Sequence, residues 1–178
     1  MKTPKIIHIF GASGAGTTTL GRAIAERIGY FHMDTDDYFW LPTDPKFTRK
    51  RDAKERIALM KRDIEAHKKV VISGSLCGWG DELTSYFDLA VRVVTATDVR
   101  IQRIRKREYE RFGERILEGG DMHGTHLDFL AWASKYDYGT PDMRSKARHD
   151  LWQSELTCEV RTVNGERNVE EMMEELGL

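Results

Sequence analysis

Short apolar runs alternate with amphipathic segments along this chain. Five runs have the length and β-branched content of buried strands, and they cover residues 5–10, 30–33, 69–73, 88–95 and 158–163. Apolar residues at helical spacing predict helices between and after them, at residues 18–28, 50–67, from 97 onward and 169–176. This alternation predicts an α/β protein with a doubly wound parallel sheet and helices on both faces.

The segment from 109 to 138 interrupts the alternation. Charged residues are followed there by Gly119, Gly120 and Gly124 and by a cluster of aromatic side chains. The pattern predicts an inserted pair of helices around a glycine-rich bend, with Thr125 as the N-cap of the second helix. Such an insertion is expected to move over a binding site.

Composition and charge limit the class of protein. The chain has 178 residues, 40% of them hydrophobic, which suits a single domain over 1–178. Its 28 Lys and Arg residues oppose 29 Asp and Glu, so neither nucleic acid nor an anionic membrane is an expected partner. Without a membrane-length apolar run, a secretory segment or a cysteine framework, the chain is expected to be cytoplasmic, as a monomer or homodimer.

A glycine-rich turn lies between the first strand and the first helix. It matches G-x-x-x-x-G-K-[ST] except that Thr17 stands at the lysine position. Glycines let successive N–H groups face one anion, and the helix start adds partial positive charge. We therefore expect nucleotide phosphates here, with a plain strand–helix turn as the alternative. The expected nucleotide-binding residues are Gly11, Ala12, Ser13, Gly14, Ala15, Gly16, Thr17, Thr18, Thr19 and, later in the chain, Arg144.

Three carboxylates follow the second strand. Asp34, Asp36 and Asp37 lie at the carboxyl end of that strand, where open α/β sheets bind ligands. Phosphorylation of a hydroxyl needs a carboxylate to orient or deprotonate it, and Mg²⁺ takes oxygen ligands. We expect Asp36 or Asp37 to act on the acceptor, and Thr18 with Asp34 or Asp36 to hold the metal. Alternatively, Asp34 or Asp36 caps a following turn.

Seven basic residues lie between positions 100 and 115. A spacing of four places Arg103, Arg107, Arg111 and Arg115 along one helix face. Guanidinium groups clamp the oxygens of a transferring phosphoryl group, so Arg103 and Arg107 are expected to be catalytic. RNA binding is another interpretation, which the overall charge disfavours. The residues expected on a solvated basic face are Arg100, Arg105 and Lys106.

The glycine loop, the acids and the arginine-rich run resemble those of the P-loop nucleoside monophosphate kinases of the adenylate and cytidylate kinase type. The resemblance implies a three-layer fold with sheet order 2-3-1-4-5, an acceptor-binding segment at about 35–68 and a helical lid at about 109–138. It implies ATP and Mg²⁺ as cofactors and a small-molecule phosphate acceptor. The G-T-T-T form of the loop is similar to that of archaeal cytidylate kinases. Thr17 in place of lysine is therefore expected to affect the rate of the reaction more than its type.

The turn after the third strand departs from the nucleotide kinases. They carry Asp-Gly-Phe-Pro-Arg there, whereas this chain has Ser-Gly-Ser-Leu-Cys-Gly-Trp over 73–79. The usual carboxylate for the metal and the usual arginine for the acceptor phosphate are absent, and Ser-Gly-Ser is closer to the Gly-Gly-Gly turn of shikimate kinases. The expected acceptor-binding residues are Asp34, Arg51 and Trp79, with plain packing as the alternative for Trp79.

Arg144 lies where the nucleotide kinases carry a second lid-closing arginine. A surface ion pair with Asp142 or Glu155 is the alternative. His123 and His126 have a spacing that zinc sites use, but the sequence supplies no evident third ligand.

These features predict an ATP- and Mg²⁺-dependent phosphotransferase of the nucleotide kinase type. It would move the γ-phosphoryl group to a small acceptor, a nucleoside monophosphate or a nucleoside. Two alternatives stay open: a kinase with a non-nucleotide acceptor, similar to shikimate and gluconate kinases, and a nucleotide-binding switch that has lost catalysis.

Overall fold

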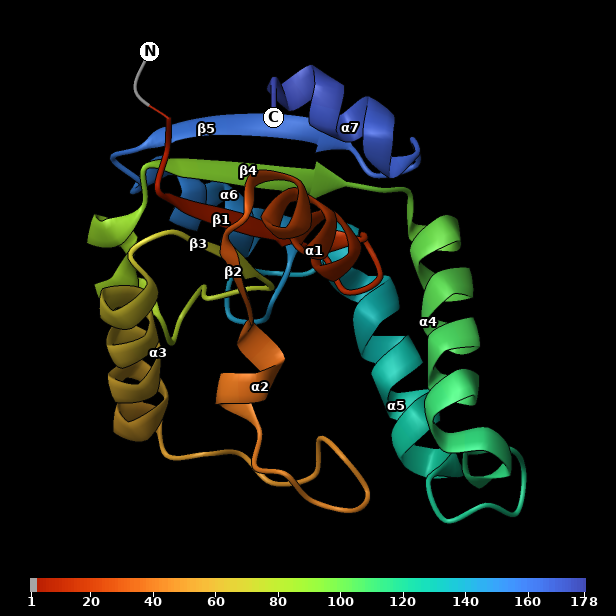
Figure 1. Cartoon of the computed structure of the whole chain (residues 1–178). Coiled ribbons are helices and arrows are strands. Elements are labelled where there is room, and N and C mark those ends of the chain that lie inside the picture. The colour runs from red at the N-terminus through yellow and green to blue at the C-terminus, as the bar shows by residue number, and fades with distance from the viewer. Residues whose placement is uncertain (1–2) are drawn as a thin grey trace.

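A sheet of parallel strands forms the centre of the protein (Figure 1), seen in a computed structural model that describes residues 3–178. Its order is β2-β3-β1-β4-β5, and each of the four pairings is parallel. The predicted α/β class and strand order are confirmed. The strands are β1 (Ile6–Gly11), β2 (Phe31–Asp34), β3 (Val70–Ser73), β4 (Leu89–Val94) and β5 (Glu159–Asn164).

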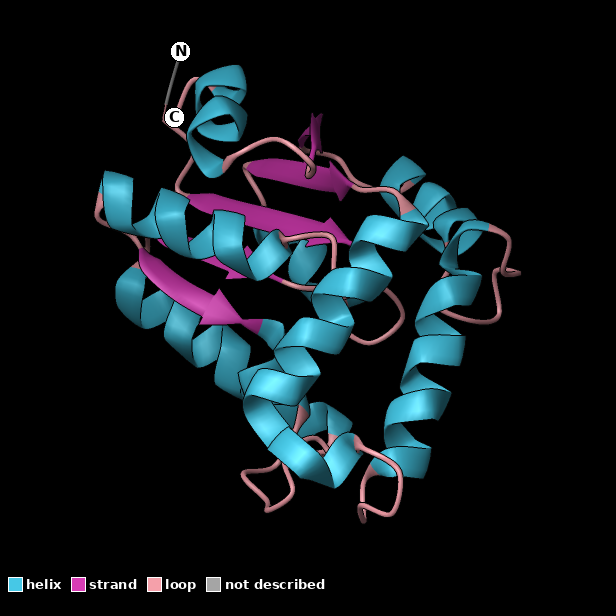
Figure 2. Ribbon diagram, turned by 90° about the vertical axis from the view of Figure 1, so that its right-hand side faces the viewer, coloured by secondary structure: helices cyan, strands magenta, loops and turns pink. Residues whose placement is uncertain are grey.

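Helices cover both faces of this sheet, and one pair projects beyond it (Figures 1 and 2). None of the described helices is long and apolar enough to cross a membrane. The helices are α1 (Thr17–Ile28), α2 (Thr35–Phe39), α3 (Ala53–His67), α4 (Thr97–Phe112), α5 (His123–Ser134), α6 (Lys146–Ser154) and α7 (Val169–Leu176). Short 3₁₀ turns are η1 (Asp81–Tyr86), η2 (Gly113–Ile116) and η3 (Lys135–Asp137).

Two apolar layers hold the helices on the sheet. Successive residues of a strand point to opposite faces, so Ile7 and Ile9 of β1 pack in the layer that includes α1 and α7. Phe10 faces the other layer, where it meets Trp152 of α6 with ring centroids 5.2 Å apart. The central strand thus has apolar cover on both sides, as parallel sheets require.

Two predicted helix starts are wrong, and both differences arise from capping. The helix expected from residue 50 begins at Ala53, because the Asp52 side chain accepts hydrogen bonds from the amides of Lys54 and Glu55 at 2.9 and 3.2 Å. Thr125 is not an N-cap but lies inside α5, which begins at His123 after Met122. Of the two helices expected within 109–138, one is α5; the other is only the end of α4, which begins at Thr97, with η2 and the glycine-rich bend between them.

Arg100 of α4 corrects the expectation of a solvated basic face. Its side chain is fully buried. The guanidinium donates to the carbonyls of Thr95, Ala133 and Ser13 at 3.1, 3.2 and 3.4 Å. It also forms an ion pair with Asp137 at 3.2 Å. This one cation therefore joins the glycine loop, α4 and the end of α5.

We expect Arg100→Met to lower the free energy of unfolding by at least about 2 kcal/mol, because each buried carbonyl left without a donor costs about 1–3 kcal/mol. Arg105→Met is the matched control on the same helix, since Arg105 is exposed and should stay within about 0.5 kcal/mol. Urea unfolding followed by tryptophan fluorescence measures both. Equal stability of the two variants would contradict the structural role of Arg100.

Two core histidines link stability to pH. His8 is fully buried, and within residues 3–178 neither of its ring nitrogens has a hydrogen-bond partner. Burial lowers the pKa of His8 to about 3. Burial, reinforced by Arg144 and Arg92, lowers the pKa of His149 to about 3. Both rings are neutral in the folded protein at neutral pH.

The free energy of unfolding should therefore fall as the pH drops below 6.5, the ordinary histidine value, because the unfolded chain binds protons that the folded chain excludes. Each ring contributes up to about 1.4 kcal/mol for each pH unit in this window. His8→Leu should remove one of these contributions and flatten the dependence. Urea titrations at pH 7.5 and pH 5.5 would show it, and an unchanged slope in the variant would count against a neutral buried His8.

Candidate active site

The loop between β1 and α1 has the backbone geometry of an anion-binding turn. Gly14 and Gly16 have φ angles of 80° and 103°, in the left-handed region that favours glycine. A Cβ atom on Gly14 would lie 2.6 Å from the carbonyl oxygen of Arg100. Gly16 is the N-cap of α1 and makes no side-chain cap, so the first amides of this 12-residue helix are available to a ligand.

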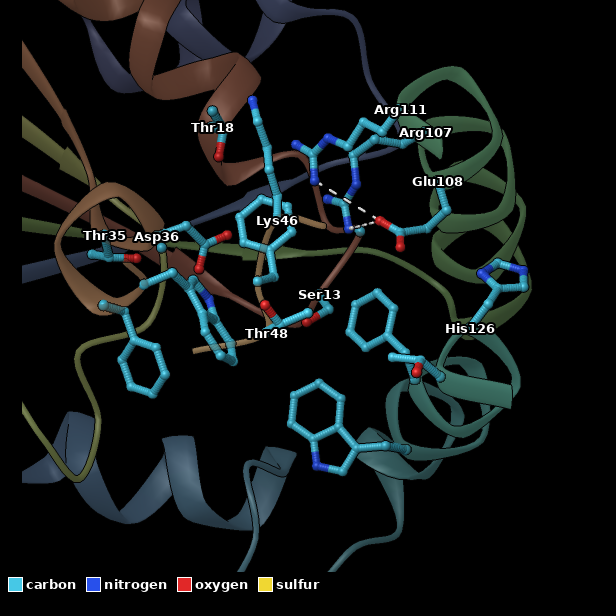
Figure 3. Close-up of a pocket in the computed structure, with 18 of the residues that line it drawn as sticks. Ser13, Thr18, Thr35, Asp36, Lys46, Thr48, Arg107, Glu108, Arg111 and His126 are labelled. Atoms are coloured by element: carbon cyan, nitrogen blue, oxygen red, sulfur yellow. Dashed lines mark ion pairs between the residues drawn. The ribbon is translucent and has the colours of Figure 1, made fainter. Parts of the chain in front are cut away.

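A cavity of about 580 Å³ opens beside this loop. Most of its lining comes from the glycine loop, the segment from the end of β2 to residue 50, and the α4–α5 pair (Figure 3). The turn after β3 and Arg144 complete it. Of the predicted loop residues, Ala15, Gly16 and Thr19 do not line the cavity. Those that do are Gly11, Ala12, Ser13, Gly14, Thr17 and Thr18.

Thr18 and Asp34 meet at one end of the cavity. The Thr18 hydroxyl donates to Asp34 Oδ2 at 3.1 Å, while Asp34 Oδ1 accepts from the amide of Asp36 at 3.0 Å. Asp34 therefore caps α2, as the alternative interpretation expected, and contacts Thr18 as well. A hydroxyl and a carboxylate placed together suit Mg²⁺, which is commonly held by few protein ligands plus phosphates and water.

No group of three or more His, Cys, Asp and Glu side chains in residues 3–178 is arranged to hold a metal ion. A magnesium site here thus depends on phosphate oxygens to complete it. Thr18 and Asp34 fit that requirement, because both line the cavity against the loop that would hold the phosphates.

Asp36 and Asp37 have different surroundings. Asp36 lines the cavity, whose walls desolvate its carboxyl group. This desolvation and the Asp34 charge raise the pKa of Asp36, while Arg144, Arg107 and Arg111 counteract the rise. Asp36 and Asp37 are both exposed to solvent, but Asp37 does not line the cavity. Of the two predicted catalytic carboxylates, the structure brings only Asp36 to the cavity.

Arginines of α4 divide between the cavity and the support of the loop. Arg107 and Arg111 line the cavity, and Glu108 lies between them with oxygen–nitrogen distances of 3.7 and 3.8 Å (Figure 3). Arg103 does not line it, because its Nη1 donates to the carbonyls of Ala15 and Gly165 at 3.3 and 2.9 Å. Of the two arginines predicted to be catalytic, the structure thus brings only Arg107 to the cavity.

Arg144 enters the same cavity from the segment before α6. Its guanidinium lies 5.4 Å from the ring centroid of Trp132. Among the described residues it forms no ion pair with Asp142 or Glu155. Its charge reaches Asp36 across the cavity. Arg144 therefore lies on the cavity wall beside α5, and its expected role in closing a lid stays a prediction.

Of the two other residues predicted to bind the acceptor, Trp79 and Arg51, only one reaches the cavity. Trp79 lines the cavity, where its indole N–H donates to the Ser75 carbonyl at 2.9 Å. Arg51 does not line it; its side chain donates to the Tyr38 carbonyl at 3.0 Å and pairs with Glu55 at 2.7 Å. Arg51 therefore holds the segment after α2 and is not brought to the cavity.

Sequence reasoning found only Trp79 of an aromatic wall and missed two lysines. The wall consists of Phe39, Trp40, Trp79, Phe129 and Trp132. Lys46 and Lys50 line the cavity from the loop after α2. The aromatics after the second strand were visible as a cluster in the sequence, but Phe129 and Trp132 join them only through the packing of α5.

Ser75 adds a buried hydrogen-bonded chain under the cavity. Its hydroxyl lies 2.9 Å from His149 Nε2, and His149 Nδ1 lies 2.8 Å from the Tyr136 hydroxyl. Because His149 is neutral, one ring nitrogen donates and the other accepts. These hydrogen bonds fix the Ser75 side chain beside the cavity.

Known proteins resemble this chain in sequence and in fold. The uncharacterised protein YqaC of Bacillus subtilis (strain 168) is 44% identical over 170 residues, which span 96% of this chain and 94% of that protein. The cytidylate kinase of Methanocorpusculum labreanum is 29% identical over 118 residues, 57% of this chain and 62% of that enzyme. A shikimate kinase from Bacteroides thetaiotaomicron has the same fold, with a TM-score of 0.59 at 18% identity over 99% of this chain and 100% of that one.

The family described as an AAA domain matches residues 7–122, which include the glycine loop, the acids after β2 and the arginines of α4. This match covers well over half of the chain, and kinases recur among the relatives in sequence and fold. The protein therefore belongs to this AAA domain family, as a P-loop kinase-type protein similar to the nucleoside monophosphate kinases.

Proposed function

We propose that the protein transfers the γ-phosphoryl group of ATP, with Mg²⁺, to a small acceptor, either a nucleoside monophosphate or a nucleoside. One observation carries this proposal. The glycine loop, Asp36 and the guanidinium groups of Arg107, Arg111 and Arg144 line a single cavity. Phosphoryl transfer is mostly positioning and charge neutralisation, and these groups supply both.

The donor side of the cavity suits a nucleotide triphosphate. The amides of the loop and the start of α1 would hold the phosphates, and Thr18 with Asp34 would hold Mg²⁺. When bound, the metal supplies positive charge to the phosphate oxygens. Arg107 and Arg111 approach the same space from α4, so their charges would meet the group being transferred.

Asp36 is the carboxylate best placed to act on the acceptor. It faces the cavity, whereas Asp34 is engaged by Thr18 and by the α2 amide. Its raised pKa brings it closer to neutral pH, where a general base is most effective. Asp36 would orient the acceptor hydroxyl or phosphate oxygen toward the donor and accept a proton where one is released.

The aromatic wall favours an acceptor with a flat ring. Phe39 and Trp79 meet with ring centroids 5.5 Å apart, and Arg56 stacks over Phe39 at 3.8 Å, which holds these rings in place. Aromatic side chains stack on nucleobases with little dependence on the base. A non-nucleotide acceptor remains the second candidate, because Cys77 stands where nucleotide kinases carry the acceptor arginine.

The experiment that decides among these acceptors measures ADP release from ATP and Mg²⁺ in the presence of nucleoside monophosphates, nucleosides and sugar acids. Turnover with a base-containing acceptor supports the proposal, and turnover only with a sugar acid supports the second candidate. Nucleotide binding without turnover on any acceptor would instead favour a switch that has lost catalysis.

Replacement of Arg107 by alanine should lower kcat by about 10²–10³-fold, the loss seen when one preorganised charge-stabilising donor is removed. The apparent KM for the nucleotide should change much less, because the charge that Arg107 meets develops in the transition state. Arg105→Ala is the matched control, since Arg105 is exposed on the same helix and does not line the cavity. Steady-state kinetics of both variants would refute the role of Arg107 if their kcat values were equal.

A further inference from the structure

The glycine loop lacks the cation that its position 17 usually supplies. Backbone amides carry only partial charges, so a triphosphate bound there needs another positive group near its outer phosphates. Of the two arginines expected to be catalytic, Arg107 lines the cavity from α4 and Arg103 does not. The Nη1 of Arg103 is committed to the carbonyls of Ala15 and Gly165. Another cation of the cavity wall approaches the start of α1, where the lysine of the standard loop would lie.

Lys46 lies on that wall in the loop that follows α2. It lines the same cavity as Thr17 and Thr18, and Figure 3 shows its side chain extended toward the start of α1, where Thr18 lies. Among the ion pairs of residues 3–178, none includes Lys46. The ammonium group is therefore available to a ligand.

Hydrogen bonds within the loop hold the backbone around Lys46 in a defined turn. The hydroxyls of Thr43 and Thr48 both donate to the carbonyl of Pro45 at 2.9 Å. At the base of the loop, Trp40 and Lys50 form an antiparallel bridge. Lys46 follows directly after the doubly bonded Pro45, so its backbone belongs to a closed turn and not to a free strand of chain.

The residues on either side of Lys46 reach across the cavity to the α4–η2 region. Asp44 forms an ion pair with Arg115 at 3.1 Å, and Arg111 lies 5.1 Å from the ring centroid of Phe47. The loop thus forms an arch from the end of α2 to the arginine-rich helix. Lys46 points from this arch back to the glycine loop (Figure 3).

We infer that Lys46 supplies to the outer phosphates of the bound nucleotide the positive charge that a lysine at position 17 supplies in the standard loop. The inference rests on the proposed nucleotide site. An ammonium group has three donors and acts as a mobile point charge, which suits phosphate oxygens approached from outside the loop. The donor nucleotide is then held partly by the acceptor-side segment of the chain, so nucleotide affinity depends on the arch.

Calorimetric titration with Mg²⁺ and a non-hydrolysable ATP analogue tests this. Lys46→Met should weaken binding of the analogue by about 10- to 100-fold, as expected for loss of one charge-assisted hydrogen bond, and should weaken ADP binding less. Arg49→Met is the matched control, because Arg49 is an exposed cation of the same loop that does not line the cavity. Thr17→Lys added to Lys46→Met should restore most of the affinity.

The outcomes separate this inference from the proposed function. If the unaltered protein binds the analogue and Lys46→Met binds it equally well, the inference fails and the proposed function stands. If the unaltered protein binds no nucleotide, both fail. A loss in Lys46→Met that Thr17→Lys does not restore also overturns the inference, because the two positions would then not perform the same task.

Discussion

The site depends on how the carbonyl groups of the glycine loop are satisfied. A loop that turns its amides toward an anion must turn carbonyls outward, and buried carbonyls need donors. Arg100 donates to Ser13, Arg103 donates to Ala15, and the Thr95 hydroxyl also donates to Ala15 at 3.0 Å. Two guanidinium groups therefore lie behind the loop. Its amides are presented to the cavity from a support that is both rigid and positively charged.

The same support fixes the position of the projecting helices. Arg100 reaches the carbonyl of Ala133 near the end of α5 and the carboxylate of Asp137 in η3. The roots of the α4–α5 pair are thus tied to the glycine loop, while Arg107 and Arg111 are carried further along α4 to the cavity. One helix supplies structural arginines at its start and site arginines two turns later.

Much of the fold and part of the site could be predicted from the sequence. Hydrophobic periodicity gave the strands and most helices, and the spacing of Gly11, Gly14 and Gly16 gave the loop, because both depend on local rules. The sequence alone could not show that Arg100 and Arg103 support the loop while Arg107 faces the cavity. Which side of α4 each arginine occupies depends on how the helix packs against the loop. The buried face was nevertheless marked by Ile104, four residues after Arg100 and four before Glu108.

Loop residues were less predictable for a different reason. Lys46 and Arg51 lie in or next to a segment without periodicity, so nothing local indicates which cation faces the cavity. Hydrogen bonds to backbone carbonyls take Arg51 away from the cavity, while Lys46 follows a turn closed by two threonines. Thr125 failed as a cap because Met122 and its neighbours begin α5 one turn earlier.

The cavity brings together cations and carboxylates from several elements of the fold. Arg107, Arg111 and Arg144 face it with Lys46 and Lys50, and Asp34, Asp36, Glu108 and Asp121 oppose them. Within this set Glu108 is buried between two arginines, with both distances longer than a direct hydrogen bond. Those arginines thus keep donor capacity that Glu108 does not satisfy. Phosphate oxygens, which accept several donors at once, are the chemical groups that such an arrangement is suited to bind.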